Sequence, residues 1–206
     1  TDQTSGCDTL ITFNIQSPPA INVQGTVTDA TCANSCNGTI SLNVTGGLAP
    51  YAFLWSPAPP AGQGTGSISG LCAGNWLVTV TDASGCDTTV TFTVLAPPPI
   101  NVVLDVVPPT CAGLCDGSAI ATVTGGVGPY TYVWSPAPGA GQGTSAATGL
   151  CAGTYALLVT DANGCDTTVT VDLVAPPPLQ AVPTQTNVSC DGQCNGTASV
   201  VVSGGA

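Results

Sequence analysis

Apolar and polar residues alternate along short runs of this chain, and these runs predict β-strands. In the run 168–173, Val169, Val171 and Leu173 alternate with polar residues. Successive side chains of a strand point to opposite faces, so such a run has one apolar face and suits a half-buried antiparallel strand. Clusters of Gly, Pro and Asn separate the runs. Between residues 100 and 178 we expect strands at 100–107, 118–124, 130–134, 144–148, 155–160 and 167–174.

The whole pattern repeats with a period of 79 residues, which the cysteines mark. All eleven cysteines fall into series with this spacing. The series are Cys7, Cys86 and Cys165; Cys32, Cys111 and Cys190; Cys36, Cys115 and Cys194; and Cys72 and Cys151. A fixed spacing of this kind indicates tandem copies of one folding unit.

Proline runs mark the boundaries between the copies. They lie at 18–19, 97–99 and 176–178, and such runs favour extended geometry and resist helices and inner strands. We therefore expect the C-terminal part of a repeat at 1–20, complete repeats at 21–99 and 100–178, and the N-terminal part of a further repeat at 179–206. Because both ends of the sequence fall inside repeats, we expect it to be a window onto a longer polypeptide.

Composition narrows the range of functions. The chain has no Lys, Arg or His, its acidic residues are eleven Asp, and its formal net charge is -11. A surface without cations repels nucleic acid and anionic membranes, and no run approaches the length of a membrane helix, so we expect neither partner. The usual general bases, phosphate clamps and imidazole ligands are missing too. We therefore expect no enzyme and no cofactor.

The cysteines favour disulfides over metal binding. Four cysteines in a repeat of about 79 residues are typical of small domains that fold in an oxidising compartment and are stabilised by disulfides. The alternative is a zinc site, since Cys32 and Cys36 have the spacing of a ligand pair. With six or seven strands in about 79 residues, we expect an all-β fold of tandem immunoglobulin-like (PKD-like) β-sandwiches stapled by disulfides.

Three runs of the second repeat resemble a known family. They are GGVGPYTYVWS at 125–135, GLCAGTY at 149–155 and VTDANGC at 159–165. They are similar to the SprB-type repeat of very large surface adhesins of gliding Bacteroidetes, and the resemblance extends over both complete and both partial repeats. It implies an extracellular, cell-surface location, export by the type IX route, and a part in cell adhesion and gliding motility.

The topology of a seven-strand sandwich constrains the disulfides. The first-to-second and fifth-to-sixth strand connections lie at one pole, which brings Cys36 to Cys72 and Cys115 to Cys151. Cys165 follows a turn at the opposite pole, roughly 20 Å away. A disulfide needs Cα atoms within about 7 Å. This places Cys165 near Cys32 of the preceding repeat.

The alternative to this bridge between repeats is a Cys32–Cys86 disulfide within one repeat, and the sequence leaves both open. The cysteines expected in disulfides are Cys36, Cys72, Cys115, Cys151, Cys32, Cys86, Cys111 and Cys165. The partners of the remaining three are expected outside the window: Cys7, Cys190 and Cys194.

One run in each repeat carries aromatic residues, whose function can be interpreted in two ways. Phe53 and Tyr132 lie on the same strand face as the candidate residues. The rings could stack on sugars or fill the core, and we favour the core because this strand is central in an immunoglobulin-like order. The candidates for glycan stacking are Tyr51, Trp55, Tyr130 and Trp134.

Asp residues suggest two further kinds of site. The segments Asp82-x-Ser84-Gly85 and 161–164 loosely resemble calcium loops, but a turn stabilised by side chains explains them better, and calcium is kept as the less favoured alternative. Asp-Thr pairs resemble the O-glycosylation signal of exported Bacteroidetes proteins; exposed Thr at a strand start is the alternative. The candidate threonines are Thr9, Thr88 and Thr167.

These patterns leave two main functional hypotheses. The first is a structural segment of a large extracellular adhesin or surface filament, a stiff shaft whose partners are neighbouring repeats of the same chain. The alternative is a carbohydrate-binding module that recognises surface polysaccharide through the aromatic strand or through loops 57–66 and 136–143. A third possibility is lateral assembly of identical chains through Leu77 and Leu158.

Overall fold

A computed structural model describes residues 11–205 of the chain. The described residues form two units. The first comprises the residues up to Ala30 together with Asn34–Ala96, and the second comprises Thr31–Ala33 together with the residues from Pro97 onward. Fourteen strands and no helix occur within this described part. The predicted all-β class is confirmed.

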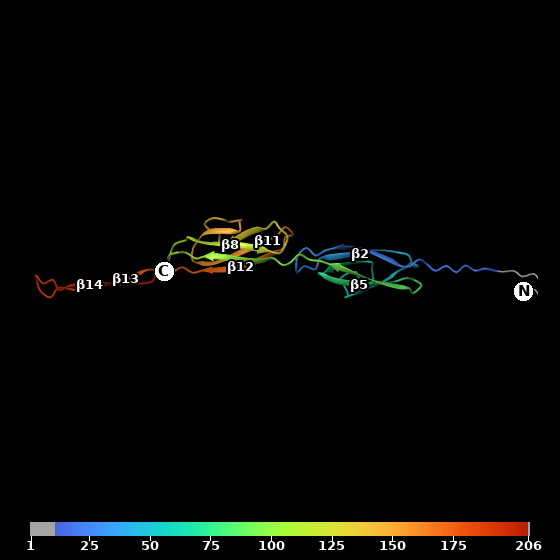
Figure 1. Cartoon of the computed structure of the whole chain (residues 1–206), viewed down its shortest axis with the longest axis horizontal. Coiled ribbons are helices and arrows are strands. Elements are labelled where there is room, and N and C mark those ends of the chain that lie inside the picture. The colour runs from blue at the N-terminus through green and yellow to red at the C-terminus, as the bar shows by residue number, and fades with distance from the viewer. Residues whose placement is uncertain (1–10, 206) are drawn as a thin grey trace, which may run out of the picture. The chain divides into compact units, whose positions relative to one another are not determined.

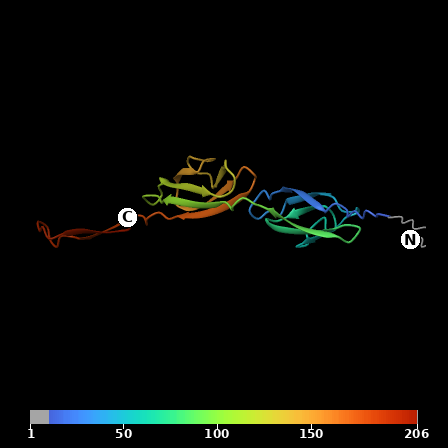
Figure 2. The same ribbon diagram turned by 45° about the vertical axis from the view of Figure 1, so that its right-hand side comes forward.

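The first unit is a sandwich of two three-stranded antiparallel sheets (Figures 1 and 2). One sheet has the order β1-β2-β4 and the other the order β3-β5-β6. The strands are β1 (Asn22–Thr28), β2 (Gly38–Thr45), β3 (Ala52–Ser56), β4 (Ser67–Leu71), β5 (Gly74–Thr81) and β6 (Asp87–Val94). This arrangement is the expected immunoglobulin-like sandwich, with six strands in each complete repeat.

The second unit contains the same sandwich, and each of its strands begins and ends 79 residues after its counterpart. Its sheets have the orders β7-β8-β10 and β9-β11-β12. The strands are β7 (Asn101–Val107), β8 (Gly117–Thr124), β9 (Thr131–Ser135), β10 (Ala146–Leu150), β11 (Gly153–Thr160) and β12 (Asp166–Leu173). A hairpin of β13 (Gln180–Thr186) and β14 (Thr197–Ser203) follows.

The core of each sandwich lies between its two sheets and follows from the alternation in the sequence. On β5, Trp76, Val78 and Val80 are buried, whereas the residues between them are exposed or half-buried. Each fully buried aliphatic side chain stabilises the fold by about 1.5–3 kcal/mol. Tyr155 replaces Trp76 in the second repeat and is also buried. In both repeats the polar group of the ring side chain bonds to the backbone of the preceding cysteine, as donor to the Cys72 carbonyl or as acceptor from the Cys151 N–H.

The aromatic strand is an edge strand, so its predicted central position is wrong. β3 and β9 each pair with one neighbour only, β5 and β11 respectively. A glutamine side chain covers the open edge. The Trp134 N–H donates to Gln142 Oε1 at 3.0 Å, and Gln142 Nε2 donates to the Trp134 carbonyl at 3.1 Å. Gln63 makes the same pair of bonds to Trp55. The side-chain amide thereby replaces a missing strand and blocks edge-to-edge pairing.

The recurrent Gly-Gly pair fits against the proline segment that precedes each sandwich. Gly125 has a φ of +74°, and a Cβ atom there would lie 2.0 Å from the Pro99 carbonyl oxygen. The next glycine, Gly126, donates its N–H to the Pro98 carbonyl at 2.8 Å. Glycine is therefore required for both the backbone conformation and the close approach of the chain.

We expect Gly125→Ala to destabilise the second unit by more than Gly143→Ala. Gly143 also has positive φ, +84°, but no atom lies within 4 Å of its added Cβ. The control should therefore cost only the conformational penalty, about 1–2 kcal/mol. Gly125→Ala adds a clash with backbone, which costs a further ~1–3 kcal/mol. Urea unfolding measures both, and equal losses would contradict the close packing of the proline segment.

Candidate functional site: the disulfide joint of Cys32 and Cys165

The structure contains three disulfides among its described residues. Two of them, Cys36–Cys72 and Cys115–Cys151, connect the loop after the first strand of a repeat to the loop after the fourth. Each spans 36 residues, and constraining a loop of that length in the unfolded chain stabilises the folded state by about 4 kcal/mol in the chain-entropy account. For a small sandwich this is a large part of the total stability.

The third disulfide joins one repeat to the next. Cys32 bonds to Cys165 across a sequence separation of 133 residues, with Cα atoms 5.7 Å apart. Cys32 lies between β1 and β2, but Thr31–Ala33 belongs to the second unit, to which Cys165 also belongs. We call this bond and the residues around it the joint.

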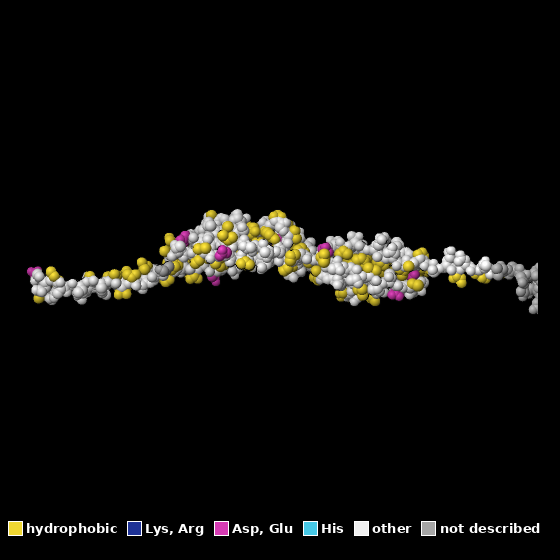
Figure 3. Space-filling view, in the orientation of Figure 1, with side chains coloured by type: hydrophobic (Ala, Val, Ile, Leu, Met, Phe, Trp, Pro, Cys, Tyr) yellow, Lys and Arg dark blue, Asp and Glu magenta, His cyan; other side chains and the backbone are white. Residues whose placement is uncertain are grey.

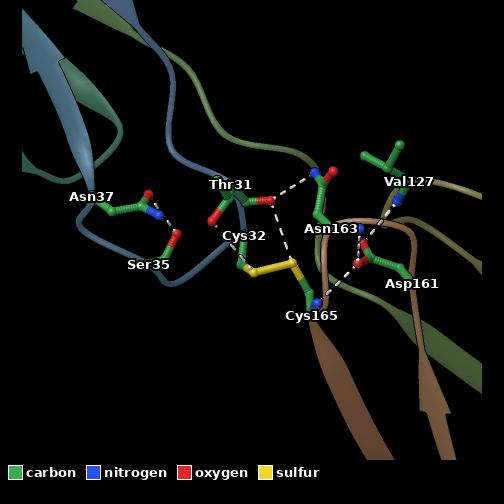
Figure 4. Close-up of a disulfide and its surroundings, with 8 residues drawn as sticks. All are labelled: Thr31, Cys32, Ser35, Asn37, Val127, Asp161, Asn163 and Cys165. Carbon is green, nitrogen blue, oxygen red and sulfur yellow. Dashed lines mark hydrogen bonds between the residues drawn. A yellow bond between two sulfur atoms is a disulfide. The ribbon is translucent and has the colours of Figure 1, made fainter.

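Asn163 adds a second connection at the joint. Its Nδ2 donates a hydrogen bond of 3.0 Å to the Thr31 carbonyl, next to the disulfide (Figure 4). The corresponding residue of the first repeat is Ser84, whose hydroxyl instead donates to Asp82 Oδ1 at 2.7 Å. The sequence placed Asn163 in a turn stabilised by side chains, but it did not predict this contact with Thr31. The replacement of Asn163 by serine one period earlier was the one sequence signal for it.

The turn that presents Cys165 is built around the buried carboxylate of Asp161. Oδ1 accepts the N–H groups of Asn163 and Cys165, both at 2.9 Å, and Oδ2 accepts the N–H of Val127 at 2.9 Å (Figure 4). The Asp161 N–H donates to the Cys165 carbonyl at 2.8 Å. These bonds fix the backbone on both sides of the turn and hold Cys165 in place. Asp82 organises the same turn in the first repeat.

The hydrogen bonds also set the charge state of both aspartates. Burial alone would raise the pKa of Asp161, but the N–H groups of Val127, Cys165 and Asn163 favour the carboxylate, and the pKa lies below its ordinary value. For Asp82, the Ser84 hydroxyl is the largest cause of a lowered pKa, against the opposing effect of burial. Both turns therefore carry ionised aspartate at neutral pH.

These contacts favour the turn interpretation of the Asp segments. Both oxygens of Asp161 accept N–H donors, and residues 11–205 contain no group of three or more His, Cys, Asp or Glu placed to hold a metal. Calcium binding stays a prediction without a structural argument. The zinc interpretation fails because its proposed ligand pair, Cys32 and Cys36, is bonded to two different cysteines.

Two of the cysteines expected in disulfides, Cys86 and Cys111, have no partner among residues 11–205. Both are exposed there, as are the free cysteines Cys190 and Cys194. A Cys32–Cys86 bond is ruled out because Cys32 bonds to Cys165. By the 79-residue period, Cys86 matches Cys165 and Cys111 matches Cys32. If Cys86 and Cys111 formed joints with the same 133-residue separation as Cys32–Cys165, the partner of each would lie at a position outside the 206-residue sequence. Cys7 lies outside the described residues.

The interpretation of the aromatic strand as a sugar platform is wrong for its two tryptophans. Trp55 and Trp134 are only 2% and 1% exposed, and each ring N–H donates to a backbone carbonyl of the following loop. Tyr51 and Tyr130 are half-buried, and their hydroxyls donate to the carbonyls of the preceding Gly-Gly pairs. The side chains therefore fill the sandwich and close its loops, even though the strand is at an edge.

The candidate glycosylation sites lie at strand starts. Thr88 and Thr167 are the second residues of β6 and β12 and are half-buried. Thr9 lies outside the described residues. O-glycosylation stays a prediction.

The surface carries charge of one sign. In Figure 3 carboxylates are scattered over the visible face, with no Lys, Arg or His side chain among them, as the sequence requires. The described part of the chain, residues 11–205, has no helix long and apolar enough to cross a membrane.

We expect acid to weaken the second unit as Asp161 becomes protonated. A folded-state pKa below the unfolded value contributes stability that is present above the unfolded pKa and is lost as pH falls through the folded pKa. Asp161→Asn should therefore lower the free energy of unfolding most at neutral pH, and the difference from the parent should shrink as the pH falls below the ordinary Asp pKa of 3.8.

Urea unfolding between pH 7 and pH 2.5 measures this dependence. Asp105→Asn, which removes one charge from an exposed position on β7, is the control and should have a much smaller effect at neutral pH. A deficit of Asp161→Asn that stays constant over this pH range would contradict the role of the carboxylate.

The comparisons with known proteins found a family match in each complete repeat. The SprB repeat family matches residues 24–59 and 103–139, one segment in each complete repeat and 79 residues apart at their starts. No curated protein matches the chain.

Several solved structures are similar at low identity. The C-terminal 282-residue fragment of intimin, solved with the intimin-binding domain of the translocated intimin receptor, has 18% identity and a TM-score of 0.39 over 82% of this chain and 67% of that one. Domains 4 and 5 of the S-layer protein SbsC have 16% identity and a TM-score of 0.31 over 78% and 100%.

The N-terminal eight Ig domains of Down Syndrome Cell Adhesion Molecule have 13% identity and a TM-score of 0.37 over 76% of this chain and 25% of that one. This chain thus spans a quarter of that structure. Scores below 0.5 bear on no functional conclusion. The family match, by contrast, covers the first three strands of each complete repeat and the run at 125–135, and it confirms the predicted resemblance there; the runs at 149–155 and 159–165 lie outside it. One segment of each complete repeat, 24–59 and 103–139, therefore matches the SprB repeat.

Proposed function

We propose that this chain is a structural segment that carries tension in a large extracellular protein, in which tandem sandwiches form the shaft of an adhesin or surface filament. The SprB repeats and the disulfides support a structural role at the cell surface. The Cys32–Cys165 bond is the observation that carries the finer proposal.

This bond changes the path that tension takes through the chain. Between a point before Cys32 and a point after Cys165, the shortest covalent route passes through the disulfide and omits residues 33–164. Those residues include the other two disulfides and the proline run at 97–99. Tension applied outside the joint therefore bypasses residues 33–164, while β1 and β12, which lie outside this loop, stay on its path.

The magnitude of the effect is large. An extended chain spans about 3.3–3.6 Å per residue, so the 133-residue separation, less the two 36-residue loops closed by the other disulfides, could lengthen to roughly 200 Å. The joint holds the ends of this segment 5.7 Å apart between Cα atoms. Unfolding of the enclosed sandwich segments then adds no length, which is a property that suits a shaft.

The carbohydrate-binding alternative has less support. Its tryptophans are buried, and loops 57–66 and 136–143 are held to the edge strands by Gln63 and Gln142. No catalytic role is proposed, because the sequence lacks His, Lys, Arg and Glu. Type IX export, gliding motility and glycosylation stay predictions that the family resemblance implies.

The structure gives little support for lateral assembly of identical chains. Leu77 is 39% exposed and Leu158 is half-buried, so the two candidate residues offer little apolar surface. Copies with a net charge of -11 also repel one another, and salt would screen this repulsion. The shaft proposal therefore rests on single chains.

Single-molecule stretching tests the proposed role. The oxidised chain is pulled from its ends, in a background where the other cysteines outside the three disulfides are serine. We expect no lengthening from residues 33–164. In Cys32→Ser/Cys165→Ser, the 133-residue separation less the two 36-residue loops frees about 60 residues, or roughly 200 Å.

Cys36→Ser/Cys72→Ser is the matched control. It removes a disulfide that lies inside the loop closed by the joint, so the stretched length should equal that of the parent. If the parent and Cys32→Ser/Cys165→Ser reached the same stretched length, the proposal that the Cys32–Cys165 bond carries the tension would be refuted.

A further inference from the structure

A pocket lies beside the free cysteine Cys111. Its volume is about 440 Å³. It is lined by the segment 110–112, the proline run 176–178, Leu179 and Gly205. Cys111 is exposed and has no disulfide partner among the described residues.

The lining residues are repeat counterparts of the residues around the joint. One period earlier, the lining corresponds to 31–33, 97–99, Ile100 and Gly126. All of these belong to the second unit, as does the Asp161–Cys165 turn.

Three of these counterparts contact that turn. Cys32 bonds to Cys165, the Thr31 carbonyl accepts Asn163 Nδ2, and a Cβ atom on Gly126 would lie 2.9 Å from Asp161 Oδ2. The surroundings that receive a turn at one position of the array are therefore repeated at the next.

Hydrogen bonds within its own loop already hold the backbone around Cys111, although Cys111 has no disulfide partner among the described residues. The Thr110 N–H and hydroxyl donate to Asp116, at 2.9 Å to Oδ1 and 2.5 Å to Oδ2. Leu114 donates its N–H to the Cys111 carbonyl at 3.2 Å. None of these bonds uses the Thr110 carbonyl, whose counterpart at Thr31 accepts Asn163.

We propose that this pocket binds the Asp-x-Asn/Ser-Gly-Cys turn of a further repeat of the same polypeptide, and that Cys111 forms a disulfide with the cysteine that ends that turn. By the same rule, Cys86 is the turn half of a joint with a preceding repeat. The inference rests on the proposed structural role, because it names the partner of the same joint.

The covalent step needs an oxidant. Two thiols lose two protons and two electrons when the S–S bond forms, and a small disulfide such as glutathione disulfide takes them up and leaves as two thiols. The exposed thiol of Cys111 is accessible to such exchange. An oxidising compartment, which the three existing disulfides also require, supplies this reactant class.

An extended chain tests the proposal at Cys111. Gly205 corresponds to Gly126, so residues 1–205 followed by a second copy of residues 127–178 complete the third repeat. After refolding with glutathione disulfide, non-reducing peptide mapping should join Cys111 to the second copy of Cys165. Maleimide should label Cys111 in the original chain and leave it unlabelled in the extended one.

Two internal controls make the result decisive. A peptide joining Cys194 to the second copy of Cys151 reports that the third repeat has folded. Replacing the second copy of Cys165 by serine should restore maleimide labelling of Cys111 and keep that peptide. A folded third repeat in which Cys111 is labelled, or is joined to Cys190, would overturn the proposal.

A second fusion tests the same rule from the other side. A copy of residues 100–178 is placed directly before residue 21, which supplies a complete preceding repeat. Cys86 should then be joined to the added copy of Cys111, and its maleimide labelling should be lost. A free Cys86 in this chain would contradict the rule. Neither fusion measures extension, so failure here is distinct from failure of the stretching test.

Discussion

One covalent bond, Cys32–Cys165, joins residues of two neighbouring repeats across a sequence separation of 133. Thr31–Ala33 leaves its own sandwich for the second unit, which places Cys32 within 5.7 Å, Cα to Cα, of its partner. A noncovalent interface between small, like-charged sandwiches would be weak, since every copy carries only acidic charge. Once a disulfide has formed, charge repulsion of this kind does not break it.

The turn that carries Cys165 shows how the chain prepares this bond. A buried carboxylate is expensive unless it is fully hydrogen-bonded, and Asp161 meets that condition with backbone N–H groups from two loops. Because three donors converge on one side chain, the turn keeps its shape without packing from outside. Asp82 repeats this solution with the help of Ser84. The aspartate therefore holds the turn in shape and positions the cysteine that ends it. This role explains why Asp stands four residues before that cysteine.

Much of this architecture could be predicted from the sequence, for reasons that particular residues make clear. Alternation on strands such as β12 gave their positions, because burial of one face dictates a period of two. The core position of Trp55 followed from its size, although the argument from a central strand was wrong. Gln63 could not be foreseen: its bonds to Trp55 depend on how loop 57–66 folds back, and no periodic pattern encodes that path. The pairing of Cys32 was open for a similar reason, since two topologies satisfied the same spacing.

The exchange of Ser84 for Asn163 shows which part of the turn is free to vary. Both residues have their N–H bonded to aspartate Oδ1, so the turn itself tolerates either side chain. They differ in reach, because serine bonds within its own turn and asparagine extends to the Thr31 carbonyl. The hydrogen bond across the joint is thus an addition to the disulfide, worth about 1 kcal/mol, against about 5 kcal/mol for closing a loop of 133 residues. Covalent chemistry decides whether neighbouring repeats are joined, and the side chain at this position only adjusts how firmly the turn is held.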